Sequence, residues 1–229
     1  MNGPTLQVQA DFDRIAAFDD GRWDHSRHYH QFLLRFLPPG RESALEVGCG
    51  RGAFTRALAR HFERVIAIDL SPAMVRRARE LSRTIENVDF RQADLSTCDL
   101  PSAGFDCIAT IATLHHLPLE DALKKLDAAL KPGGVLLVLD LYQPRTLADW
   151  IWSACALPCD LLLRAWHRLP LREAPHVRQA WSEHARHDVY PTMAEIRSLG
   201  ERLLPGVTVR RHLFWRYSLV WEKPAAPAR

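Results

Sequence analysis

The chain has 229 residues, of which 47% are hydrophobic and 25% are charged, as in a globular protein with one well-filled core. Its net charge of +3 is too small to imply a nucleic-acid partner, and its arginines are scattered rather than gathered in a stripe. The five cysteines form no CxxC pair, so we expect reduced thiols in a cytoplasmic protein and no metal site.

Neither the start of the chain nor its most apolar stretch has the pattern of a targeting or membrane-spanning segment. Residues 1–9 are polar and lack the apolar core of a signal peptide. The most apolar stretch, 147–163, is interrupted by Asp149, Pro158 and Asp160. We therefore expect no stable membrane insertion. An amphipathic role or a role as a lid stays open for this stretch.

Residues 1–40 predict a helical N-terminal segment. Within it, residues 12–36 show helical periodicity in two blocks, and the second, 29–37, carries a strong apolar face. Pro38-Pro39-Gly40 then ends the helical pattern, because proline cannot continue a helix.

Strand and helix signals alternate through residues 41–141. The expected strands are 44–47, 64–69, 88–93, 105–111 and 135–140, and the expected helices are 53–61, 72–82 and 119–130. Ser71 and Pro72 supply an N-cap and a proline at the first position of one helix. This alternation predicts an α/β fold with a doubly wound, mostly parallel sheet that is covered by helices on both faces.

The C-terminal part of the chain breaks this alternation. Residues 207–214 and 215–221 predict two strands with almost no loop between them, as in an antiparallel hairpin that completes a seven-stranded sheet at its edge. A long helical insert, 142–204, precedes the hairpin and holds several tryptophans. We therefore expect these parts in chain order: 1–40 helical, 41–141 core, 142–204 insert, 205–223 hairpin and 224–229 a disordered tail.

The most informative motif is Glu46-Val47-Gly48-Cys49-Gly50-Arg51-Gly52, where a strand ends in alternating glycines before a helix. Because glycine has no Cβ, such a turn brings backbone amides close to a ligand. The spacing is neither that of the dinucleotide pattern GxGxxG nor that of a Walker loop. The acidic Glu46 suits an amine-bearing ligand better than a phosphate. A turn without any ligand is the alternative at this point.

The glycine motif is followed in order by Asp69, by Asp94, by Phe105-Asp106-Cys107-Ile108 and by Leu130-Lys131-Pro132-Gly133-Gly134. In order and spacing this set resembles the class I S-adenosylmethionine-dependent methyltransferases of the small-molecule type. The resemblance covers residues 45–141, and residues 216–221 resemble the edge strand that closes such sheets. It implies S-adenosyl-L-methionine as the cofactor and S-adenosyl-L-homocysteine as the product.

The resemblance assigns cofactor-binding roles to residues at the strand ends. The turn with Gly48, Cys49, Gly50 and Gly52 would pass beneath the amino acid end of the cofactor, and Glu46 would hold that loop or the ammonium group. Asp69 would accept hydrogen bonds from both ribose hydroxyls, because a carboxylate has two oxygens for that diol.

The adenine would lie beyond the third strand. Asp94 would accept a hydrogen bond from its amino group, and the apolar part of the cofactor site would be formed by Leu70, Met74, Leu95 and Ile111. Two alternatives remain for the acids: Asp69 or Asp94 could serve only as a helix cap or a turn residue, and NAD could bind an acid after the second strand. The glycine spacing and the Lys-Pro-Gly-Gly turn disfavour NAD.

The methyl acceptor would be bound near the end of the fourth strand. Small-molecule O-methyltransferases that the chain resembles often carry a pair of histidines here, as at His115 and His116, and in some of them an acid at the position of Asp140 supports the first histidine. A histidine oriented by a carboxylate suits general-base catalysis. The alternative is that one or both histidines only cap the strand or pack on the loop.

Two further segments could cover the site. In the family the segment before the first strand commonly folds over the cofactor as a lid, which makes His25 and Tyr29 candidates to contact cofactor or substrate. Trp150 and Trp152 of the insert suggest a hydrophobic acceptor pocket or a dimer interface. A helix packed on the sheet and ordinary core packing are the respective alternatives.

The sequence thus predicts a cytoplasmic methyltransferase that acts on a small, partly hydrophobic acceptor, with oxygen as the favoured atom and a homodimer through the insert as an open possibility. Methylation of nitrogen or carbon by proximity alone is the second hypothesis. A third is a cofactor-binding protein of this fold that transfers no methyl group, such as a cyclase or a structural partner.

Overall fold

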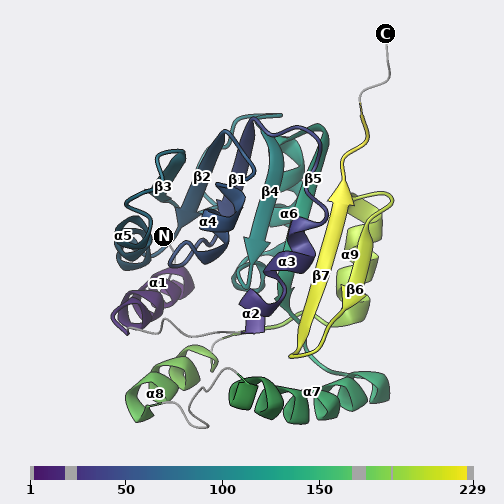
Figure 1. Ribbon diagram of the computed structural model, residues 1–229. Helices are drawn as coiled ribbons and strands as arrows, with labels where there is room; N and C mark the ends of the chain where they lie inside the picture. The colour runs from purple at the N-terminus through teal and green to yellow at the C-terminus, as the bar shows by residue number, and fades with distance from the viewer. Residues whose placement is uncertain (1–2, 19–24, 167–173, 187, 226–229) are drawn as a thin grey trace.

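The computed structural model describes residues 3–18, 25–166, 174–186 and 188–225. Its centre is a seven-stranded sheet with the order β3-β2-β1-β4-β5-β7-β6 (Figure 1). The strands are β1 (Ser43–Val47), β2 (Arg64–Asp69), β3 (Val88–Gln92), β4 (Phe105–Ile111), β5 (Leu130–Leu141), β6 (Thr208–Arg211) and β7 (Arg216–Glu222). β7 pairs antiparallel with both β5 and β6, whereas the other neighbours are parallel. The predicted fold class is confirmed.

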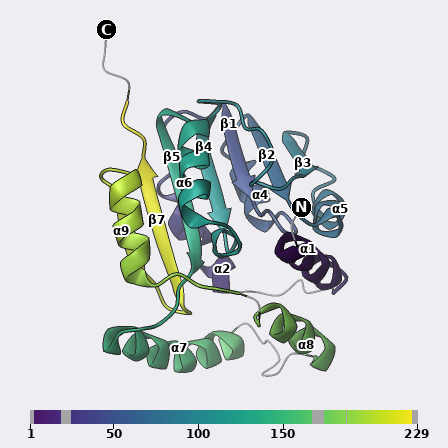
Figure 2. The same ribbon diagram turned by 180° about the vertical axis from the view of Figure 1, so that it is seen from behind.

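Helices cover both faces of the sheet, as the apolar strands require. Figures 1 and 2 show α3 (His30–Leu34) and α4 (Ala53–Leu58) on one face, and α6 (Leu119–Ala129) and α9 (Met193–Leu203) on the other. β5 serves both layers because its side chains alternate. Leu136 and Val138 pack in the cluster with α6 and α9, whereas Leu137 and Leu139 pack in the cluster with α3 and α4. The remaining sheet-covering helix, α5 (Pro72–Leu81), packs on β2 and β3.

The carboxyl ends of the parallel strands are the functional edge in folds of this kind, because the strand order reverses there between β1 and β4. Three helices lie beyond this edge: α1 (Gly3–Ala16), α7 (Leu147–Trp166) and α8 (Pro175–His184) (Figures 1 and 2). A short α2 (His25–His28) and the 3₁₀ helix η1 (Leu114–His116) also lie near it. The described part of the chain has no helix that is both long and apolar enough to cross a bilayer.

The structure differs from the sequence expectations at both ends of the chain. The first helix begins at Gly3, earlier than the periodicity indicates, and packs against α5 and α8. In the insert, α9 is part of the layer on the sheet, with Met193 and Ile196 in the main core cluster. Only α7 and α8 of the insert therefore stand beyond the sheet edge. The tail residues 226–229 lie outside the described part of the chain.

Candidate cofactor and active site

The glycine turn between β1 and α4 is held against the neighbouring strand by its own backbone. The amides of Gly48 and Cys49 both donate to the carbonyl of Ile68 in β2, at 2.8 and 3.0 Å. Gly48, Gly50 and Gly52 have φ angles of +71°, +50° and +72°, a region that residues with a Cβ rarely adopt. The alternating glycines of the motif therefore follow from the backbone conformation of the turn.

Two of these glycines have different surroundings. A Cβ at Gly48 would lie 1.9 Å from Thr113 Oγ1, so Gly48 permits a close approach of the turn to the loop after β4. A Cβ at Gly50 would meet nothing within 4 Å. The open space beside Gly50 is compatible with the amino acid end of the cofactor, which the resemblance expects at this turn.

Glu46 is buried at the end of β1 and accepts a hydrogen bond from the hydroxyl of Thr55 in α4. Burial raises the pKa of Glu46 to about 8, against the opposing effect of this hydrogen bond. Glu46 thus joins the strand before the turn to the helix after it. This contact agrees with the predicted role of holding the loop, and a contact with the cofactor's ammonium group stays a prediction.

Asp69 at the end of β2 faces the same turn. Its Oδ2 accepts from the amide of Gly50 at 2.8 Å, and its Oδ1 accepts from the amide of Ser71 at 2.9 Å. Burial raises the pKa of Asp69 to about 6 in spite of these two bonds. A carboxylate has about four lone-pair sites, so two backbone bonds leave capacity for a ribose diol. The residues present therefore fit S-adenosylmethionine.

The residues expected around the adenine lie at the ends of β2, β3 and β4. Asp94 uses Oδ1 to accept from the amide and hydroxyl of Ser96, at 2.8 and 2.6 Å, and so is also a turn acid. The apolar residues differ in exposure: Met74 and Leu95 are buried, and Leu70 and Ile111 are partly exposed. Cys49 in the turn is buried against Ala67 and Val75. Whether these residues touch the adenine stays a prediction.

Asp13 of α1 lies near the cofactor site, although no sequence motif marks it as a site residue. Its Oδ1 accepts from the hydroxyl of Ser71 at 2.5 Å and from the amide of Ala73 at 3.1 Å, at the first turn of α5. Ile15 and Ala16 of the same helix pack on Met74. α1 therefore covers the start of α5, next to Asp69. The contact of Asp13 with α5 cannot be predicted from the sequence, because it depends on where α1 packs in the tertiary structure.

His115 and Asp140 come together at the ends of the neighbouring strands β4 and β5. His115 Nδ1 lies 2.6 Å from Asp140 Oδ1, and the amide of His115 donates to Asp140 Oδ2 at 3.1 Å. Both side chains are buried. Burial would raise the pKa of Asp140, but the facing His115 ring and three hydrogen bonds hold that pKa below its usual value. A charged Asp140 accepts a hydrogen bond from Nδ1–H of His115, which fixes the tautomer in which Nε2 of the neutral ring carries the free lone pair.

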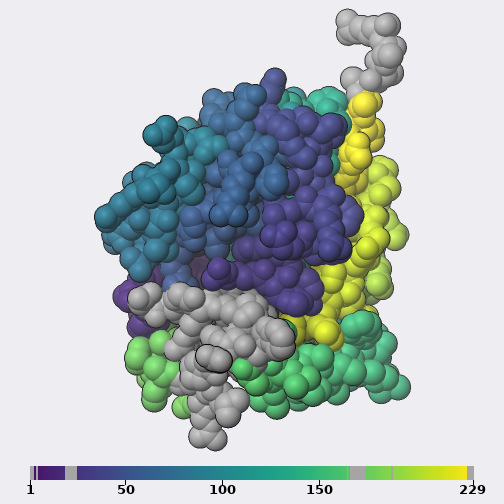
Figure 3. All heavy atoms as spheres, viewed as in Figure 1, coloured from purple at the N-terminus to yellow at the C-terminus, as the bar shows by residue number. Residues whose placement is uncertain are grey.

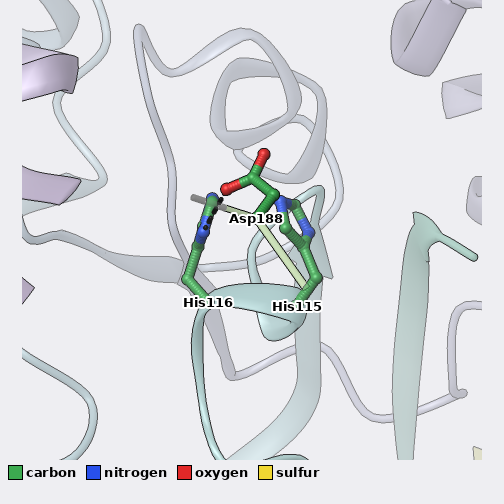
Figure 4. A group of neighbouring side chains, drawn as sticks. All are labelled: His115, His116 and Asp188. Carbon is green, nitrogen blue, oxygen red and sulfur yellow. Dashed lines mark ion pairs between the residues drawn. The ribbon is translucent and has the colours of Figure 1, made fainter. Parts of the chain in front are cut away.

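His116 belongs to a second polar cluster, which Figure 4 shows beside His115. Its Nδ1 lies 3.3 Å from Asp188 Oδ1, and Asp188 Oδ2 accepts from the hydroxyl of Tyr190 at 2.7 Å. His184 of α8 lies between Asp188 and Asp11 of α1, with contacts of 3.7 and 3.4 Å. Burial, followed by repulsion from His115, lowers the pKa of His116 to about 4. His116 is therefore neutral at physiological pH.

His116 and Asp188 of this second cluster, together with the neighbouring His115, have side chains of the types that bind metal ions. One ligand atom from each of His115, His116 and Asp188 lies within 4.8 Å of the others. Asp188 lies far along the chain, in the connection between α8 and α9, and no local sequence pattern marks it.

The structure places Tyr29 and His25 against the β6–β7 loop at the carboxyl end of β5, and the two tryptophans on α7 beyond this edge. Tyr29 is buried and donates to the carbonyl of Leu213 at 3.2 Å, and burial raises its pKa to about 12. His25 Nε2 lies 2.8 Å from Asp160 Oδ1 of α7, and its ring stacks on Phe214. The expected pocket residues Trp150 and Trp152 are exposed by 60% and 43%. They lie on the outer side of α7, because its acids face inward.

Comparison with known proteins gives consistent results. Residues 45–138 match the family described as a methyltransferase domain. An uncharacterized methyltransferase of Mycobacterium tuberculosis is 33% identical over 211 residues, which cover 90% of this chain and 99% of that protein. The ubiquinone biosynthesis O-methyltransferase of Xylella fastidiosa (strain 9a5c) is 33% identical over 195 residues, 77% of each chain.

A solved structure has a similar fold. It is the N-methyltransferase NodS of Bradyrhizobium japonicum in complex with S-adenosyl-L-homocysteine, with a TM-score of 0.64 at 21% identity. The match covers 95% of this chain and 98% of that one. At this identity the likeness concerns the fold.

The glycine turn fits the amino acid end of the cofactor, and Asp69 fits its ribose. A chain with this turn, at 33% identity to a methyltransferase over 99% of that protein's length, belongs to the class I S-adenosylmethionine-dependent methyltransferases, and its cofactor is S-adenosyl-L-methionine.

Proposed function

We propose that the enzyme transfers the methyl group to an oxygen atom of a small, partly hydrophobic metabolite, with His115 as the general base and Asp140 as the residue that orients it. The observation that carries this proposal is the 2.6 Å contact between His115 Nδ1 and Asp140 Oδ1. When bound, S-adenosylmethionine supplies an activated methyl group. The residues of the chain then have to place the acceptor and take its proton.

A base is of use only for an acceptor whose proton has a high pKa, such as a hydroxyl. Nε2 of His115 would take this proton as the oxygen attacks the methyl carbon, and Asp140 would stabilise the resulting imidazolium. General-base catalysis of this kind contributes about 10²–10⁴-fold in rate. A paired, buried carboxylate is a costly arrangement for a histidine that serves only to cap a strand.

The support for oxygen as the acceptor atom comes from the name of a related protein, and no pocket in the described part of the chain adds to it. The Xylella fastidiosa relative is named as an O-methyltransferase of ubiquinone biosynthesis, which favours oxygen. Trp150 and Trp152 are exposed on the outer side of α7 and give no support for an aromatic pocket. Methylation of nitrogen or carbon by proximity alone is the alternative, and it makes His115 dispensable.

We also propose that no metal takes part, as the sequence suggests. The support is that several of the possible ligand atoms already contact other side chains, although Nε2 of His116 is buried without a hydrogen-bond partner among the described residues. His115 Nδ1 is engaged by Asp140, and Asp188 accepts from Tyr190 while it faces His116. His116 would then act as a neutral positioning residue between His115 and Asp188.

The acceptor atom can be determined directly. The enzyme is incubated with a metabolite extract and S-adenosylmethionine that carries a ¹³C-labelled methyl group, and the product is examined by mass spectrometry and ¹³C NMR. The proposal predicts one methylated small molecule whose label has the chemical shift of a methoxy group. A label with the shift of an N-methyl or C-methyl group would contradict it.

A further inference from the structure

The helix α7 is amphipathic, but its apolar side faces outward and its acids face the protein. Its inner side carries the acids Asp149 and Asp160 together with Ala156, whereas its outer side is apolar. The exposed large residues are Leu147, Trp150, Ile151, Trp152, Leu157, Leu161 and Leu162, with exposed fractions from 43% to 77%. Small or sulfur-containing residues fill the outer positions between them: Ala148, Ala154, Cys155, Pro158 and Ala165. An apolar face of this extent is unusual on a soluble monomer.

Polar contacts fix this orientation. Asp149 Oδ2 accepts from the amides of Arg145 and Thr146 at 3.0 and 2.8 Å, and its Oδ1 lies 2.5 Å from Nη2 of Arg211 in β6. Asp160 pairs with His25 of α2 at 2.8 Å. A rotation of α7 that buried the apolar face would break these pairs. The exposure of the apolar side is therefore built into the fold.

The charged residues of α7, α8 and the residues that flank them also differ in exposure according to their sign. Among the side chains that the structure describes in 143–166, 174–186 and 188, the exposed charged residues are Arg145, Arg178 and Arg186. Each acid of the same stretch has a partner. Besides Asp149 and Asp160, Asp188 faces His116 and Tyr190, and Glu183 pairs with Arg14 of α1 at the surface. The exposed charge of α7, α8 and the residues that flank them is thus basic, whereas α9 also exposes Glu195 and Glu201.

α7 and α8 form one end of the molecule, beyond the carboxyl ends of the parallel strands (Figures 1 and 2). In Figure 3 the green atoms of α7 lie along the lower right edge of the molecule. We use the name insert face for the exposed apolar residues of α7 together with Trp181, Arg178 and Arg186 of α8. Trp181 is 40% exposed and lies between the two arginines in sequence. A tryptophan next to basic residues is typical of proteins that contact a membrane surface.

We propose that the insert face binds the surface of an anionic lipid bilayer, with α7 lying in the plane of the membrane. The outer apolar positions extend around more than half of the helix, so the face is convex, and a fluid bilayer can surround such a surface. Arginines beside an apolar face would contact anionic head groups, each contributing about 1 kcal/mol. No described helix can span the bilayer, which leaves an interfacial position.

A second copy of the chain is the competing occupant, and the charges disfavour it. In a twofold dimer each copy presents the same surface to the other, so an interface through the insert face would bring the arginines of both copies into one contact area. The convex shape adds to this, because two ridges cover each other poorly. The inference concerns where the enzyme works and is independent of which atom it methylates.

The test is co-flotation of the purified full-length protein with vesicles. Vesicles of phosphatidylcholine alone are compared with vesicles that contain phosphatidylglycerol. We expect binding to the anionic vesicles and at least about tenfold weaker binding to the neutral ones or at high salt. Fluorescence of the tryptophans should be quenched by brominated lipid in the wild-type protein, and Trp150→Phe should reduce this quenching.

The variant I151E/L161E places two charges on the apolar ridge, at positions that are 57% and 56% exposed. It should lose vesicle binding at least about tenfold while it keeps the melting temperature and the affinity for S-adenosyl-L-homocysteine. L81E is the matched control, because Leu81 is also exposed, at 44%, but lies on α5. L81E should bind vesicles as the wild type does. If I151E/L161E fails to fold, the quenching of the wild-type protein still decides.

Three results would overturn the proposal. One is a wild-type protein that neither floats with anionic vesicles nor shows quenching. Another is equal binding by the wild type and a folded I151E/L161E. In the third, light scattering shows that the wild type is a dimer and does not bind vesicles, whereas I151E/L161E is a monomer. The insert face would then be a dimer interface.

Discussion

His115 Nδ1 lies 2.6 Å from Asp140 Oδ1, and this contact joins the ends of two strands in the middle of the sheet. β4 and β5 are parallel neighbours, so their carboxyl ends lie side by side. His115 follows β4 by a few residues, and Asp140 is near the end of β5. The two residues are thus brought together by the sheet itself, at the edge where the cofactor binds.

Asp140→Asn tests the orienting role. The amide keeps the size of the side chain but cannot hold the Nδ1 proton as a carboxylate does, and it no longer stabilises an imidazolium. We expect turnover to fall at least about tenfold at pH 7, with the KM for S-adenosylmethionine unchanged. Turnover within about twofold of the wild type would contradict the orienting role.

Gly50→Ala separates cofactor binding from backbone strain. Gly50 and Gly133 both have a positive φ, +50° and +76°, and a Cβ at either would meet nothing within 4 Å. Alanine should therefore cost each about 1–2 kcal/mol of stability. Only Gly50→Ala should also weaken S-adenosyl-L-homocysteine binding, by at least about tenfold in calorimetry. Equal affinities in the two variants would place the cofactor elsewhere.

Glu46 predicts a pH-dependent stability. Its pKa is about 8 in the folded protein, against an ordinary value of 4.5, because of burial. The folded state therefore keeps a proton that the unfolded chain has lost, and the free energy of unfolding falls as pH rises between these values. The slope is at most about 1.4 kcal/mol per pH unit.

Glu46→Gln removes this titration. Urea unfolding at pH 6.5 and 8 should show a smaller loss of stability for the variant than for the wild type, because Asp69, with a pKa of about 6, has largely titrated below that range. Asp89→Asn, at an exposed acid of β3, is the control and should behave as the wild type does. The same slope in Glu46→Gln would contradict the assignment.

Removal of metal should leave the enzyme active. The side chains of His115, His116 and Asp188 are close enough to bind an ion, but each already contacts another side chain. Dialysis against a chelator should therefore change turnover by less than about twofold. Loss of activity that zinc or magnesium restores would instead make this cluster a metal centre.

The alternation of strands and helices could be predicted, and a candidate cofactor site proposed, because the signals for both are local. Glycines that need a positive φ mark the turn, and acids at strand ends mark the edge where ligands bind. Asp69 and Gly50 lie 2.8 Å apart in the structure, as two neighbouring parallel strands would place them. The pairing of His115 with Asp140 came from the family resemblance, and the structure places the two residues at the ends of neighbouring strands.

The cluster around His116 could not be predicted from local signals. It combines Asp11, His184 and Asp188, from segments at opposite ends of the chain, and no periodicity links them. The orientation of α7 could not be predicted either. Its tryptophans suggested a pocket or a dimer interface, and the contacts of its acids with Arg211 and His25 leave the tryptophans on the outer side. The choice between inner and outer sides depended on partners that the sequence does not identify.

The most direct test of the central claim is the turnover of His115→Ala, measured with the acceptor that the labelled-methyl experiment identifies. His115→Gln serves as a second variant that keeps most of the volume of the ring. We predict that turnover falls by at least about tenfold, and up to about 10⁴-fold, in both variants, while the affinity for S-adenosyl-L-homocysteine stays that of the wild type. Turnover within about twofold of the wild type would contradict the claim that His115 is the base.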